Sequence, residues 1–148
     1  MDLKKYNVTL VKEDCKRYTA IDRKVNSPDK IADVLITAMN MDKLAQEIFV
    51  LLAFDTQKNL IGLFEVSRGT IDQTLVHPAE IFKRALLCNA HSIAIAHNHP
   101  GGGIVPSPED VKVTSTIKRC GEMMGVPLVD HVIIGDNQYY SFLEYANL

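Results

Sequence analysis

Two histidines separated by one residue, His97 and His99, are followed by Ser107 and, three residues later, by Asp110. The apolar run Ile93 to Ala96 leads directly into the histidines and predicts a strand, in which side chains at i and i+2 point to the same face. Both imidazoles can therefore converge on one ion, and a glycine-rich loop lets the chain bring Asp110 back to it. Two histidines and one carboxylate form a known catalytic zinc set that leaves one position open for water. The same ligands can also hold iron(II).

The serine and the aspartate also allow an interpretation without chemistry. Ser107-Pro108-Glu109-Asp110 is typical of a helix start, with serine at the N-cap, proline at N1 and a carboxylate at N3. Capping alone would explain Ser107 and Asp110, but it explains neither histidine. We therefore predict His97, His99 and Asp110 as metal ligands, with Asp110 at a helix start. Ser107 is expected either to cap that helix or to assist the chemistry.

Glu65 is the candidate general base. It lies in the predicted strand Leu60 to Ser67, where apolar neighbours would raise the pKa of its carboxyl group and suit it to take a proton from water. Spacing alone favours a different interpretation, an outward-facing glutamate on a half-exposed strand. The assignment of Glu65 as the base therefore depends on the resemblance described below.

The rest of the chain predicts strands and helices in mixed order. Helices are expected to begin at Ser27-Pro28, after His77-Pro78 and at Ser107, the last of them ending by Gly125. Strands are expected near Asn7 to Val11, Ile48 to Phe54, Leu60 to Ser67, Ile93 to Ala96, Leu128 to Ile134 and Gln138 to Leu143. The second and third of these strands form a hairpin. This order favours an α/β or α+β fold whose sheet has mixed strand direction.

Composition limits the partners that are expected. The chain has 148 residues and a formal net charge of −2, so the charge gives no support to nucleic acid as the main partner. No apolar run reaches the ~18 residues of a membrane span, and the amino terminus lacks the apolar core of a secretory signal. The three separated cysteines are typical of reduced thiols, which predicts a cytoplasmic protein.

Several motifs in the same order resemble a known family. His97-x-His99, seven residues, Ser107, two residues and Asp110 match the JAMM motif of MPN+ metalloproteases. Longer segments are similar to the RadC-like branch of that superfamily: Glu65-Val-Ser-Arg-Gly-Thr-Ile, Val76-His-Pro-x-Glu80-Ile-Phe, His97-Asn-His-Pro and Asp130-His131-Val-Ile-Ile-Gly135. The similarity runs roughly from Ser27 to Leu143. We therefore expect a RadC-like JAMM/MPN domain over residues 27–148, after an amino-terminal lead-in segment of residues 1–26.

The resemblance implies a cytidine-deaminase-like mixed sheet flanked by helices. It implies one zinc ion per chain, held by His97, His99, Asp110 and a water. Glu65 would be the base that activates this water, and Ser107 would hydrogen-bond the oxyanion as a carbonyl is attacked. The implied activity is cleavage of an amide, peptide or isopeptide bond in a peptide or protein. The alternative is a non-catalytic metal-binding module associated with DNA repair or mobile-element DNA metabolism, which needs the ligands but no base.

The chain also departs from its relatives. Longer members of that family carry an amino-terminal helix-hairpin-helix segment of the kind that binds DNA, and none is expected within these 148 residues. Asn98 stands where eukaryotic deubiquitinating relatives carry Ser or Thr, so a ubiquitin substrate is not expected. The pair Asp130-His131 either orients a zinc ligand or is structural. A homodimer through exposed sheet edges is compatible with the sequence, which does not decide the oligomeric state.

Overall fold

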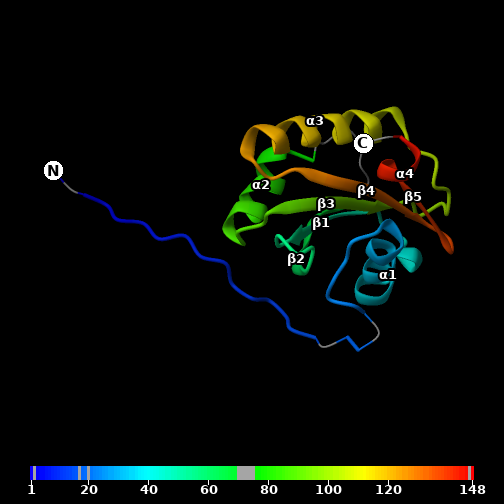
Figure 1. The fold of residues 1–148 in the computed structure, drawn as a ribbon, viewed down its shortest axis with the longest axis horizontal. Coiled ribbons are helices and arrows are strands. Elements are labelled where there is room, and N and C mark those ends of the chain that lie inside the picture. The colour runs from blue at the N-terminus through cyan, green and yellow to red at the C-terminus, as the bar shows by residue number, and fades with distance from the viewer. Residues whose placement is uncertain (2, 17, 20, 70–75, 147) are drawn as a thin grey trace.

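A five-stranded mixed sheet forms the centre of the molecule in the computed structural model, which describes all residues except 2, 17, 20, 70–75 and 147 (Figure 1). Its order is β2-β1-β3-β4-β5. The strands are β1 Ile48–Phe54, β2 Leu60–Arg68, β3 Ser92–Asn98, β4 Leu128–Gly135 and β5 Gln138–Ser141. β3 and β4 are parallel and the other neighbours are antiparallel, which confirms the mixed sheet and the β1–β2 hairpin. Thr70 and Ile71, which end one of the RadC-like segments, lie outside the described residues.

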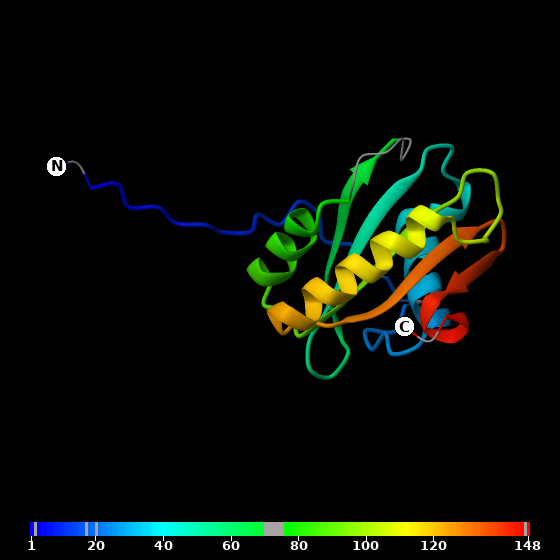
Figure 2. The ribbon, with the colours of Figure 1, turned by 90° about the horizontal axis from the view of Figure 1, so that it is seen from above.

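Helices cover both faces of the sheet (Figure 2). They are α1 Pro28–Met39, the 3₁₀ turn η1 Met41–Lys43, α2 Pro78–Leu87, α3 Pro108–Met124 and α4 Phe142–Tyr145. α1 lies on one face, while α2 and α3 lie on the other (Figure 1). Alternate residues of β1 supply the two cores: Val50 and Leu52 pack with α1, and Phe49 and Leu51 pack with α2 and α3. The fold is therefore an α+β architecture with helices on both sides of one sheet.

The predicted helix starts are confirmed. Ser27 precedes Pro28 at the start of α1, and Ser107 precedes Pro108 at the start of α3. α3 ends at Met124 and is capped by Gly125, whose φ of 69° is left-handed and therefore favours glycine. These local signals fix where α3 begins, and with it the position of Asp110.

Two predicted strands differ from the structure. The strand expected near Asn7 to Val11 does not form, because residues 3–11 extend away from the body of the molecule and have no strand beside them (Figures 1 and 2). The last strand ends at Ser141 instead of Leu143. There Asp130 Oδ1 accepts a hydrogen bond from the Leu143 backbone N–H at 3.0 Å, and Ser141 Oγ accepts one from Glu144 N–H at 3.1 Å, so the chain turns into α4. Among the described helices, none is long and apolar enough to cross a membrane.

Candidate metal centre

The two histidines leave the end of β3 toward the face that α3 covers. His97 is fully buried and pairs in register with Phe49 of β1, and its Nε2 lies 3.0 Å from Nε2 of His99. His99 follows the strand, and its backbone N–H donates to the carbonyl of Ile134 in β4 at 2.9 Å. Its Nδ1 lies 3.1 Å from the carbonyl oxygen of Gly103 and must donate to it. In neutral His99 the lone pair is therefore on Nε2, the atom that faces His97.

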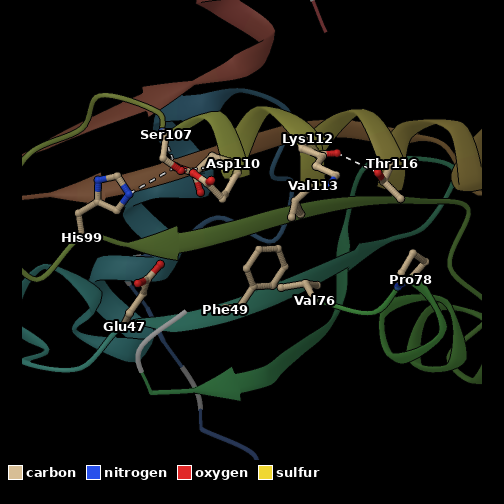
Figure 3. A pocket seen from close by; sticks show the side chains of 11 residues that line it. Glu47, Phe49, Val76, Pro78, His99, Ser107, Asp110, Lys112, Val113 and Thr116 are labelled. Carbon is tan, nitrogen blue, oxygen red and sulfur yellow. Dashed lines mark hydrogen bonds and ion pairs between the residues drawn. The ribbon is translucent and has the colours of Figure 1, made fainter. Parts of the chain in front are cut away.

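Asp110 reaches both histidines from the first turn of α3, and Figure 3 shows it beside His99. Ser107 donates to Asp110 Oδ2 from its backbone N–H at 2.7 Å and from its hydroxyl at 2.8 Å, and Ser107 Oγ accepts from Asp110 N–H at 3.1 Å. Burial raises the pKa of Asp110, but the contact with His97 and the hydrogen bonds from Ser107 outweigh burial and hold the pKa well below its usual value. The capping box therefore forms, and it holds an ionised carboxylate beside the histidines.

The distances among the three predicted ligands fit one small cation. His97 Nε2 is 3.1 Å from Asp110 Oδ1, and His99 Nε2 is 3.7 Å from Asp110 Oδ2. Ligand atoms about 2.0–2.1 Å from a tetrahedral zinc ion lie about 3.3 Å from one another. The three separations of 3.0, 3.1 and 3.7 Å lie on both sides of that value. His97, His99 and Asp110 are thus brought together as the sequence predicted.

A second carboxylate, which the sequence analysis missed, lies across from this triangle. Glu47 immediately precedes β1, and continuing the antiparallel register beyond Phe49 and His97 places it opposite His99 on the same face. Ligand atoms of Glu47, His97 and His99 all lie within 4.8 Å of one another. Figure 3 shows the Glu47 carboxylate projecting toward His99 from the side opposite Asp110. The histidine pair is therefore flanked by two carboxylates from different elements.

Glu65, which the sequence analysis predicted as the base beside the metal ligands, does not lie near them. It pairs in register with Val50, and Val50 packs in the core on the α1 face, so Glu65 points to the opposite face of the sheet from His97. Its carboxylate instead accepts two hydrogen bonds from the Arg68 guanidinium, each at 2.7 Å. Of the two glutamates, Glu47 lies beside the histidine pair and Glu65 does not.

The side chain between the two histidines connects the metal centre to Glu47. Asn98 is buried, and its Oδ1 accepts a hydrogen bond from Ile48 N–H at 2.8 Å. Its Nδ2 donates to the carbonyl of Gln46 at 3.1 Å and contacts the carbonyl of Leu44 at 3.4 Å. One amide therefore holds the backbone on both sides of Glu47, the residue opposite His99.

Replacing Asn98 by alanine is expected to lower the free energy of unfolding by about 1–3 kcal/mol, because it leaves buried backbone groups without partners. Urea denaturation followed by circular dichroism measures this loss. Asn59→Ala is the matched control, since it removes the hydrogen bond that Asn59 Nδ2 donates to Asp55 Oδ2 in a surface turn and should cost less. Equal stability of Asn98→Ala and the wild type would contradict the role given to Asn98.

Comparison with known proteins agrees with the motifs. Residues 25–147 match the family model of the RadC-like JAB domain. The chain is 41% identical to a UPF0758 protein of Clostridium perfringens over 121 residues. These residues are 82% of this chain and 52% of the relative. A UPF0758 protein of Clostridium beijerinckii is 42% identical over 123 residues, 83% of this chain and 53% of the relative. A UPF0758 protein of Staphylococcus haemolyticus is 36% identical over 121 residues, which are 82% of this chain and 52% of the relative.

The chain thus spans about half the length of the curated relatives that it matches. The matched region includes every element that supplies the metal centre, from Glu47 before β1 to Asp110 in α3. The family is compatible with a metal-dependent, hydrolase-like module, and Glu47, His97 and His99 form a possible metal site in this structure. The chain belongs to the RadC-like JAB domain family.

Proposed function

We propose that this domain is a zinc-dependent hydrolase that cleaves an amide, peptide or isopeptide bond. The observation that carries the proposal is the pairing of a three-ligand triangle with a separate carboxylate. His97, His99 and Asp110 have the spacing of three zinc ligands, and Glu47 approaches from the other side. Three protein ligands and an open position are the pattern of a catalytic zinc site, whereas structural sites are closed by four.

Each residue has a distinct part in the proposed reaction. Zinc, when bound, polarises a carbonyl and lowers the pKa of a coordinated water to about 7. Glu47 takes the proton of the attacking water and later gives it to the leaving amine. The Ser107 backbone N–H keeps Asp110 in place, while the single hydroxyl proton, donated to Asp110 Oδ2 before the reaction, turns to the oxyanion as the carbonyl is attacked. The base is therefore assigned to Glu47 and no longer to Glu65, while the proposed reaction type is unchanged.

The surroundings of the centre suit an extended peptide. A groove of about 520 Å³ runs along α3 past the metal centre, a size typical of ligand sites (Figure 3). Phe49, Val76 and Val113 form an apolar part of its wall, while Glu109, Lys112 and Thr116 of α3 line it as well. We therefore expect the substrate to place an apolar side chain next to the bond that is cleaved, since such a wall gains free energy by covering apolar surface.

Metal analysis combined with a peptide screen tests the proposal. Purified protein is expected to hold about one zinc per chain and to cleave members of a peptide and isopeptide library. Chelation should stop turnover, and added zinc should restore it. Stoichiometric zinc without turnover would instead favour the metal-binding module. In that case salt-dependent binding to duplex DNA would be the next measurement.

A further inference from the structure

His131 is a buried histidine that the proposed reaction does not use. It lies in β4, is fully buried, and stacks on Phe142 with ring centroids 4.9 Å apart. Each of its ring nitrogens has one polar neighbour. Nε2 lies 2.9 Å from Nδ1 of His97, and Nδ1 lies 2.6 Å from the hydroxyl oxygen of Thr114 in α3. A chain of hydrogen bonds thus leads from α3 through β4 to a metal ligand.

The direction of this chain follows from the single proton of the threonine hydroxyl. Thr114 donates that proton to the backbone carbonyl of Asp110, one turn earlier in α3, at 2.6 Å. Its oxygen can then only accept from His131, so the His131 proton is on Nδ1. The ring is fully buried and neither of its two hydrogen-bond partners is a carboxylate, so an unpaired charge there would be costly and the neutral ring is favoured. His131 Nε2 therefore carries a lone pair and accepts from His97 Nδ1–H.

This direction leaves the metal-facing nitrogen of His97 free. With the proton on Nδ1, the lone pair of neutral His97 is on Nε2, 3.0 Å from His99 Nε2 and 3.1 Å from Asp110 Oδ1. In His99 the carbonyl of Gly103 likewise holds the proton on Nδ1 and leaves the lone pair on Nε2. Two imidazole lone pairs and one carboxylate then face a common point, which is the donor set that a cation satisfies.

We propose that Thr114 and His131 are positioning residues that keep the His97 proton on Nδ1 and so hold Nε2 ready for the metal, an inference that rests on the proposed metal site. Hydrogen bonds donated in the opposite direction, from Thr114 towards His97, would be incompatible with this role. If Thr114 donated to His131, His131 Nε2–H would donate to His97 Nδ1, and the His97 proton would lie on Nε2, where the metal binds. The carbonyl of Asp110 therefore selects the tautomer of His97 through three successive hydrogen bonds.

Thr114→Val tests the relay because valine has nearly the same shape and no hydroxyl. Outer hydrogen-bond partners of metal ligands typically change metal affinity by about 10–100-fold, so zinc affinity measured by chelator competition should fall by that factor. Thr114→Ser keeps the hydroxyl and should restore affinity. Thr116→Val is the matched control. It removes the same kind of bond, from Thr116 Oγ1 to the Lys112 carbonyl at 2.9 Å, from an exposed part of α3 (Figure 3).

Imidazole ¹⁵N spectra of the metal-free protein give an independent measurement. We expect His97 and His131 both to carry the proton on Nδ1 in the wild type, and His97 to change tautomer in Thr114→Val. Thermal melts monitor whether that variant stays folded. A His131 proton on Nε2, or equal zinc affinity of Thr114→Val and the wild type, overturns the relay. Absence of zinc uptake by the wild type overturns the proposed hydrolase instead, while the spectra still decide the direction of the relay.

Discussion

Replacing Glu47 by glutamine is expected to lower kcat by about 10²–10⁴-fold, the range typical of removing a general base. Glutamine has nearly the shape of glutamate but cannot take a proton. The metal should stay bound at about one ion per chain, because His97, His99 and Asp110 already supply three ligands. Steady-state hydrolysis of the best peptide from the screen, measured with metal analysis on the same sample, tests both parts.

Glu65→Gln is the matched control for this experiment. The same substitution is made eighteen residues later in the chain, on the opposite face of the sheet, where the carboxylate pairs with Arg68. Loss of such a partly exposed ion pair costs about 0–1 kcal/mol and should leave kcat unchanged. Loss of turnover in Glu65→Gln with normal turnover in Glu47→Gln would return the role of base to Glu65. Loss of zinc in Glu47→Gln would make Glu47 a ligand.

Replacing His97 by alanine is expected to remove both zinc and turnover. His97 supplies the central ligand atom, since its Nε2 lies within 3.1 Å of the donor atoms of both His99 and Asp110. Two remaining protein ligands do not make the three-ligand site that catalytic zinc requires. Elemental analysis should find less than one zinc per chain, and hydrolysis should fall to the uncatalysed rate.

The control for this variant is His91→Ala. The His91 side chain is exposed, so its loss should change neither zinc content nor turnover. Circular dichroism verifies that His97→Ala stays folded, which is expected because the two cores on either side of the sheet do not depend on the metal. Full zinc content in a folded His97→Ala protein would show that the ion is bound elsewhere.

Local signals in the sequence were sufficient to predict most elements. The serine-proline pairs at Ser27 and Ser107 fix two helix starts, and the apolar run Ile48 to Phe54 gives the bounds of β1. Each signal works because capping and burial act within a few residues of chain. The histidine spacing is equally local, since alternation along one strand is enough to place His97 and His99 together.

The base could not be identified in this way, because its position depends on the pairing of distant strands. Glu47 and His99 are fifty-two residues apart, and they meet only because β1 and β3 are antiparallel neighbours in a particular register. A shift of one residue would turn Glu47 to the other face. One signal in the sequence could have pointed to Glu47, namely an acidic residue directly before a strand whose residues are all buried. Such a strand lies in the middle of a sheet, so a residue at its end lies beside the ends of neighbouring strands. Thr114 and His131 meet through tertiary packing in the same way.

Asn98 has a consequence for engineering. The groove with its histidines opens on one side of the sheet, while the amide that anchors the segment before β1 points to the other. A designer who transplanted only the visible lining of the groove onto a new scaffold would copy the ligands and leave their support behind. A working graft would have to carry the full thickness of the sheet at this point, including residues that no substrate touches.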